Sequence, residues 1–152
     1  MLYLPPEYET SYADYPVVYI NGEEDVAKIM EVIEPCFEVK CKSFLLISIL
    51  SSNWKDDYSP WPAAALVKKE GAFGGGAAAY LHVLTNTVKP FIDGNFRAKK
   101  HIEDTVLMGY SLGGLASLYS LYTSNTFGKI GCLSGSLWFD GWVEFMEGNL
   151  PI

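Results

Sequence analysis

The sequence predicts an α/β fold in which a mostly parallel sheet lies between two layers of helices. Apolar, β-branched runs alternate along the chain with segments whose apolar residues recur at helical spacing. This alternation is typical of right-handed βαβ units, which build a parallel sheet covered by helices on both faces. A length of 152 residues fits one domain, so we expect a single domain over residues 1–152.

The expected elements follow one another in a regular order. Short apolar runs predict strands at residues 16–21, 43–50, 104–108 and 129–133. Helical spacing of apolar residues predicts helices at 23–33, 77–91, 112–122 and 137–146. Residues 51–76, rich in Trp, Pro, Ser and Gly, read as one long loop, and loops of this length are often functional.

Composition narrows the classes of function and partner. A net charge of −7 disfavours nucleic acid and anionic membrane surfaces as partners. The apolar runs are too short to span a bilayer, and the first residues lack a signal-peptide pattern. The 3 cysteines lack metal-site spacing and fit buried free thiols better than a Cys36–Cys41 disulfide. We therefore expect a cytoplasmic protein that needs no metal or other cofactor.

The most informative motif is Gly-Tyr-Ser-Leu-Gly-Gly at residues 109–114, between an expected strand and an expected helix. It fits the Gly-x-Ser-x-Gly pattern of a nucleophile elbow, in which a strained turn exposes the serine hydroxyl. The glycines are needed because strand and helix backbones approach closely there. A serine that merely begins a helix is the simpler alternative, but the flanking elements and Gly114 favour Ser111 as a nucleophile.

A serine nucleophile needs backbone N–H groups that stabilise the oxyanion of the tetrahedral intermediate. The N–H of Leu112 would lie at a helix N-terminus, where the helix dipole favours negative charge. A second donor should follow an earlier strand, where Gly22 permits a tight turn that would aim the N–H of Glu23 inward. An ordinary strand-to-helix turn is the alternative for Glu23.

The sequence offers no evident general base for Ser111. The histidine of folds with this motif comes last in the chain, yet none follows Ser111 here. His101 precedes the same strand and would lie about 20 Å away, at ~3.3 Å per strand residue. His82 falls on the polar face of its expected helix. The later carboxylates are expected on a solvated helix face: Asp140, Glu144 and Glu147.

Aromatic residues gather at the edge of the sheet where open α/β folds bind ligands. The loop after the second strand carries Trp54, Tyr58 and Trp61, and Trp138 follows the fourth strand. Together with Tyr110, which precedes the serine, they are candidates for the walls of a substrate pocket. Packing against the core is the alternative for these aromatic side chains.

Taken together, these motifs resemble the putative-esterase family of α/β-hydrolases, which includes esterase D, the enterochelin-type siderophore esterases and the mycolyltransferases. The Asp-Tyr-x-Pro-Trp loop at residues 57–61 is most similar to the siderophore esterases. The segments that carry the resemblance are Tyr3-Leu4-Pro5-Pro6-x-Tyr8, residues 15–22, residues 57–61, residues 109–114 and Ser134-Gly135-Ser136-Leu137-Trp138. Asn21 departs from the family, whose members usually carry aspartate there.

The resemblance implies an incomplete α/β-hydrolase, because family members have a further hairpin before this region and further strands after it that carry the acid and the histidine. It implies an acyl-enzyme mechanism through Ser111 on small carboxylic esters, with weak or absent turnover. A non-catalytic binding module and an acyltransferase remain alternatives. The last strand would become an exposed edge, which predicts a homo-oligomer or a partner chain that covers it.

Overall fold

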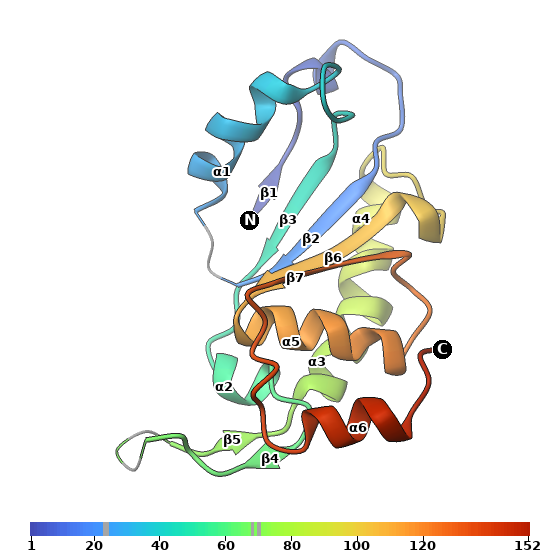
Figure 1. Cartoon of the computed structure of the whole chain (residues 1–152). Coiled ribbons are helices and arrows are strands. Elements are labelled where there is room, and N and C mark those ends of the chain that lie inside the picture. The colour runs from blue at the N-terminus through green and yellow to red at the C-terminus, as the bar shows by residue number, and fades with distance from the viewer. Residues whose placement is uncertain (23–24, 68, 70) are drawn as a thin grey trace.

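The computed structural model describes residues 1–22, 25–67, 69 and 71–152. Within these residues, a five-stranded sheet has the order β1-β3-β2-β6-β7 (Figure 1). Within this sheet only β1 runs antiparallel to its neighbour; the other pairs of the sheet are parallel, which confirms the predicted mostly parallel sheet. The strands are β1 (Leu2–Tyr3), β2 (Val17–Asn21), β3 (Leu45–Ile49), β6 (Thr105–Tyr110) and β7 (Lys129–Leu133).

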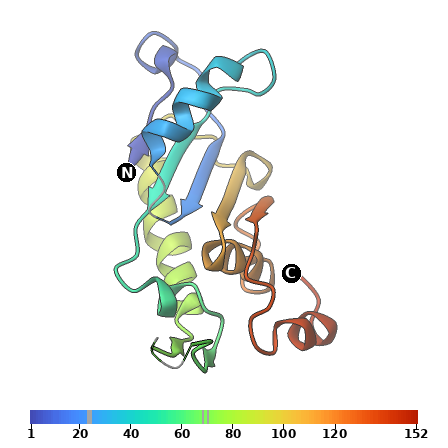
Figure 2. The ribbon, with the colours of Figure 1, turned by 60° about the vertical axis from the view of Figure 1, so that its left-hand side comes forward.

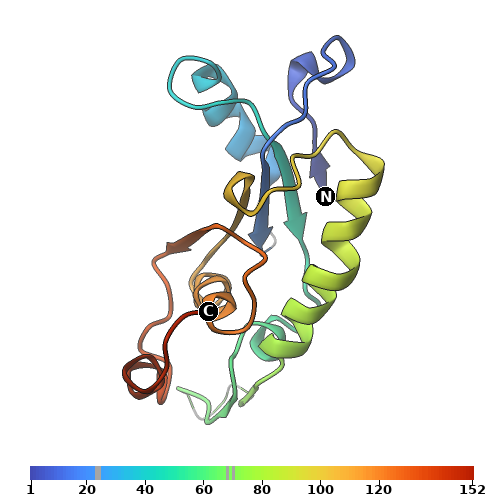
Figure 3. The same ribbon diagram turned by 90° about the vertical axis from the view of Figure 1, so that its right-hand side faces the viewer.

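Helices lie on both faces of the sheet, so the predicted three-layer α/β/α architecture is confirmed. The helix α1 (Val26–Ile33) lies on one face, and α3 (Ala77–Val83), α4 (Lys89–Asn95) and α5 (Leu112–Tyr119) lie on the other (Figures 2 and 3). The helix α6 (Trp142–Gly148) packs outside α5. Short helical turns are η1 (Pro6–Glu9), η2 (Glu34–Cys36), η4 (Ile102–Asp104) and η5 (Ser120–Tyr122). No helix in the described part of the chain is long and apolar enough to cross a membrane.

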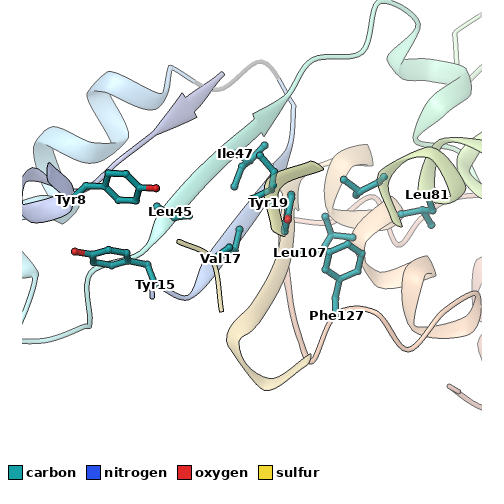
Figure 4. Packing of buried hydrophobic residues seen from close by; sticks show 12 residues of the cluster. Tyr8, Tyr15, Val17, Tyr19, Leu45, Ile47, Leu81, Leu107 and Phe127 are labelled. Atoms are coloured by element: carbon teal, nitrogen blue, oxygen red, sulfur yellow. The ribbon is translucent and has the colours of Figure 1, made fainter. Parts of the chain in front are cut away.

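The core divides into layers because successive side chains of a strand point to opposite faces. On β2, Val17 and Tyr19 face α3 and α4, where they pack with Leu107 of β6 (Figure 4). Ile20 points the other way and packs against Val26 of α1. The central strand is thus buried on both sides, as its continuous apolar run predicts.

The predicted helix at residues 77–91 is longer and contains a wide turn. The turn η3 (Leu84–Val88) is a π-helix between α3 and α4. Pro90 lies at the start of α4, and its nitrogen has no hydrogen to donate to a carbonyl one turn earlier. This missing donor accounts for the change in hydrogen-bond spacing at that point.

The segment 51–76 is not one irregular loop. It contains the short helix α2 (Trp54–Asp57) and a hairpin of β4 (Pro62–Ala63) and β5 (Phe73–Gly74). A Cβ on Gly74 would lie 2.1 Å from a carboxylate oxygen of Asp56, so the hairpin packs tightly on α2. The strand β1 was not predicted either, because a strand of two residues is too short to show an alternating pattern.

The last helix begins later than residues 137–146 predict. Phe139 donates its N–H to the carbonyl of Ser136 at 3.0 Å, and Gly141 adopts a positive φ of 75°. These turns interrupt the helical path, and α6 starts only at Trp142. Part of the apolar spacing that predicted a helix belongs instead to a turn, whose Phe139 packs on the core.

Candidate active site

Ser111 occupies the turn between β6 and α5. Its backbone has φ 53° and ψ −119°, a conformation that non-glycine residues rarely adopt. Its N–H donates to the carbonyl of Leu133 at 3.0 Å, and its own carbonyl accepts the N–H of Leu115 at 3.1 Å. Both peptide groups of this strained residue are therefore held by neighbouring elements.

The glycines of the motif allow three backbones to meet at this turn. A Cβ on Gly109 would lie 2.4 Å from the carbonyl carbon of Gly113. A Cβ on Gly113 would lie 2.5 Å from the carbonyl oxygen of Asn21, at the end of the central strand. Real Cβ atoms do not tolerate such distances, so the sequence prediction that side chains cannot fit here is confirmed.

A cavity of about 200 Å³ lies beside Ser111 at the carboxyl edge of the sheet. The structure brings together several residues that the sequence singled out: Ser111, Leu112, Trp54, Tyr58 and Tyr110 all line this cavity. The Trp54 and Tyr110 side chains are 50% and 60% exposed, whereas Tyr58 is buried and donates its hydroxyl to the carbonyl of Ile49. Its other lining residues are Asn21, Gly22, Ser51 and Gly113.

The other two predicted aromatic residues lie elsewhere. The indole N–H of Trp61 donates to the carbonyl of Asp140 at 2.8 Å, and its ring packs on Trp142 and Phe145. Trp61 thus joins the aromatic layer between α5 and α6, which corrects its expected place in the pocket wall. Trp138 is half exposed and lies near Phe73, outside the lining of the cavity.

Sequence reasoning missed Ser136, whose hydroxyl oxygen lies 3.1 Å from that of Ser111. Ser136 is only 1% exposed, and its N–H donates to the carbonyl of Ser111 at 3.0 Å. It therefore contacts the candidate nucleophile through both side chain and backbone. The available signal was the second serine of the Ser-Gly-Ser-x-Trp segment, which follows the fourth predicted strand.

Asn21 is also more important than the sequence suggested. Its side-chain amide donates to the Ser117 hydroxyl at 2.9 Å and to the Gly113 carbonyl at 3.3 Å, both on α5. Its side-chain oxygen accepts the hydroxyl of Tyr80 at 2.6 Å, and burial raises the pKa of that tyrosine. Asn21 thus joins β2, α3 and α5 directly beneath the cavity. The polar residue at the end of an apolar strand was the available signal.

The candidate oxyanion donors are only partly described. Leu112 is the first residue of α5, so its N–H has no acceptor within the helix. Gly22 lines the cavity with φ 139°, and its N–H donates to the carbonyl of Ile49 at 3.2 Å. Glu23, the second predicted donor, lies outside the described residues.

No histidine of the described chain lines this cavity. His82 lies on α3, where its ring nitrogen is 3.2 Å from the side-chain nitrogen of Asn86. His101 precedes η4, at the opposite end of β6 from Ser111. Ser51, at the cavity, donates to a carboxylate oxygen of Asp57 at 2.6 Å, so this carboxylate is bound to Ser51.

A strained serine between a parallel strand and a helix, beside a cavity at the carboxyl edge of the sheet, defines the α/β-hydrolase class. A family model described as "Putative esterase" matches residues 1–144. The chain therefore belongs to the putative esterase family.

Relatives agree with this assignment. The chain is 36% identical over 146 residues to the uncharacterized protein YbbA of Bacillus subtilis, covering 94% of this chain and 58% of YbbA. The crystal structure of an IroE-like serine hydrolase from Shewanella oneidensis matches with a TM-score of 0.86 and 26% identity, covering 97% of this chain and 49% of the other. The siderophore hydrolase EstA from Aspergillus nidulans shares the fold, with a TM-score of 0.71, 20% identity, and coverage of 90% and 50%. The chain thus spans about half the length of these relatives.

Proposed function

We propose that Ser111 is the nucleophile of a carboxylic-ester hydrolase site. The observation that carries this proposal is the strained backbone of Ser111, which lies at a cavity, donates a hydrogen bond to β7 and accepts one from α5. Ser111 would attack the ester carbonyl, and the alcohol would leave as an acyl-enzyme forms. Water would then release the acid and restore the serine hydroxyl.

The N–H of Leu112 would stabilise the oxyanion of the tetrahedral intermediate, helped by the positive end of the α5 dipole. By resemblance, the N–H of Glu23 is the second donor. The solved structures that share this fold include two proteins named as siderophore hydrolases, and a siderophore ester is one substrate class that this supports. The cavity of about 200 Å³ suits a small acyl group.

We expect weak turnover from this chain by itself. The hydroxyl of Ser136, 3.1 Å from Ser111, is no general base at neutral pH, and the described cavity contains no histidine. Enzymes without a triad member keep a residual acceleration of about 10³–10⁴ over water through the oxyanion hole and binding. A rate in that range would therefore fit the site as it stands.

The test compares hydrolysis of p-nitrophenyl butyrate by the wild-type chain, Ser111→Ala and Ser52→Ala. Ser52 is exposed, follows the cavity residue Ser51 in the sequence and does not line the cavity, so it serves as the matched control. We expect Ser111→Ala to lose the part of the rate that passes through an acyl-enzyme and to keep only what the oxyanion hole and binding supply, and Ser52→Ala to retain the wild-type rate. Labelling of Ser111 by a fluorophosphonate, found by mass spectrometry, tests nucleophilicity without turnover. Equal rates in all three proteins and no labelling would contradict the proposal.

A binding module is the second candidate, favoured by the contact between Ser111 and Ser136 in place of a base. In that case a small ester would raise the melting temperature without being hydrolysed. Trp54→Ala should remove this shift, because Trp54 lines the cavity.

A further inference from the structure

The segment that follows β7 returns to the candidate nucleophile. Ser136 donates its N–H to the carbonyl of Ser111 at 3.0 Å, and the two hydroxyl oxygens lie 3.1 Å apart. Ser136 is 1% exposed and is not among the described residues that line the cavity beside Ser111. Its hydroxyl therefore contacts the nucleophile from the protein side, where a substrate in the cavity would not touch it.

Residues 134–139 hold Ser136 in place through their backbone and their packing. Ser134 has a positive φ of 43°, which is uncommon for a residue with a side chain. The carbonyl of Ser136 accepts the N–H of Phe139 at 3.0 Å, and the buried ring of Phe139 packs on Phe73. Unusual backbone conformations of this kind concentrate at functional sites. The fold thus fixes where the Ser136 hydroxyl lies.

The surroundings of the two hydroxyls indicate which one donates the hydrogen bond. Within the part of the chain that the structure describes, the Ser111 oxygen is the only hydrogen-bond partner of the Ser136 hydroxyl. A buried hydroxyl that donates to no acceptor costs free energy, so the hydrogen of Ser136 points to Ser111. The Ser111 hydroxyl lies at the cavity, and its own hydrogen can point into that cavity.

We propose that Ser136 is a positioning residue for the nucleophile. Its hydroxyl donates a hydrogen bond to the Ser111 oxygen, which fixes the orientation of that oxygen and leaves the Ser111 hydrogen free to point into the cavity. The same bond stabilises the negative charge that develops on the Ser111 oxygen during attack, and Ser136 keeps its own proton throughout. This inference rests on the proposed function, because it requires Ser111 to be the nucleophile.

The test measures the reaction of a fluorophosphonate with Ser111 in the full chain, in Ser136→Ala and in Ser120→Ala. Ser120 is the matched control, because it is also 1% exposed and its hydroxyl donates to the carbonyl of Ser117 at 2.6 Å. The rate of labelling is measured against reagent concentration, which separates binding of the reagent from its reaction.

We expect Ser136→Ala to lower the limiting rate about threefold to tenfold, the effect of one hydrogen bond, with less than about a twofold change in the half-saturating concentration. Ser120→Ala should label as the wild type does. Both variants lose a buried hydroxyl, so both should show a lower melting temperature, and only Ser136→Ala should also react more slowly.

Two further measurements separate positioning from the filling of space. Ser136→Cys keeps the size of the side chain but donates only weakly, so it should recover little of the rate. Crystal structures should show one rotamer of Ser111 in the wild type and more than one in Ser136→Ala.

The outcomes separate this proposal from the assignment of the nucleophile. Labelling of Ser111 at equal rates in the wild type and Ser136→Ala overturns only the role of Ser136. Full recovery of the rate in Ser136→Cys, equal slowing in Ser120→Ala, or a single Ser111 rotamer in both crystal structures also overturns it. Absence of labelling in every protein contradicts the proposed function itself, and the role of Ser136 falls with it.

Discussion

At the scale of single residues, Ser111 combines a strained backbone with a hydroxyl at a cavity. A non-glycine residue in such a conformation costs about 1–3 kcal/mol, which the rest of the fold must offset. The hydrogen bonds from Ser111 to Leu133 and from Leu115 to Ser111 hold it there. Strain of this kind is typical of sites where a reactive side chain must stand clear of its own backbone.

Replacement of Ser111 by glycine should therefore stabilise the protein. We expect the free energy of unfolding of Ser111→Gly to exceed that of Ser111→Ala by about 1 kcal/mol, since glycine adopts a positive φ without strain but gains freedom in the unfolded chain. Urea unfolding measures the difference. Equal stability of the two variants would show that the backbone of Ser111 is unstrained.

For Gly113, two residues after Ser111, we expect the opposite effect: its replacement should destabilise the protein. Gly113→Ala would press a Cβ to 2.5 Å from the carbonyl oxygen of Asn21 and should lower the free energy of unfolding by about 1–3 kcal/mol. Gly94, on α4, has open space around its Cβ position, so Gly94→Ala should gain up to about 1 kcal/mol. A loss of equal size in both variants would mean that close packing at Gly113 is not the cause.

At the scale of elements, the sequence located the parallel strands and most helices, because long apolar runs and helical spacing reflect burial directly. The prediction of elements was wrong where contacts between distant parts of the chain override the local sequence pattern. The strand β1 is too short to show a period, and α6 starts late because Gly141 and the Ser136 turn intervene. The wide turn η3 follows from the missing N–H of Pro90, which the apolar spacing does not reveal.

In the candidate site, too, some residues could be predicted from the sequence and others could not. Ser111 and its glycines were predictable because one short motif fixes a local turn. The Ser136 contact was not, since it depends on how β7 lies beside β6, and the packing of Trp61 depends on α6. Contacts between elements distant in sequence leave no periodic signal.

Asn21 supports a prediction at this scale because it joins three elements. Asn21→Ala would leave the Tyr80 hydroxyl and the Gly113 carbonyl without that partner, and should lower the free energy of unfolding by about 2–4 kcal/mol. Asn95→Ala removes an exposed bond to the Phe91 carbonyl and should change it by less than about 1 kcal/mol. Chemical denaturation compares the two, and similar losses would contradict a linking role for Asn21.

At the scale of the whole molecule, the described helices cover one face of the sheet more fully than the other. The less covered face is apolar and is bordered by Leu133, whereas the net charge of −7 opposes contact between copies. Burial of apolar surface would therefore favour self-association through this face, and electrostatic repulsion between the copies would oppose it.

Added salt should consequently promote self-association. At about 0.5 M NaCl the repulsion is screened over a few ångströms, while burial of apolar surface is retained. Sedimentation velocity should show a larger associated fraction than at low salt, and Leu133→Glu should reduce it. Dissociation on addition of salt would instead show that ion pairs hold the copies together.

The position of β2 at the centre of the sheet also decides when the protein can fold during its synthesis. β2 is translated well before its partner β6, which lies more than half of the 152 residues later. At about 5–20 residues per second, a ribosome takes several seconds to supply that partner. During this interval the newly made β2 has an unpaired side, and only the emergence of residues 105–110 allows the sheet to close around it.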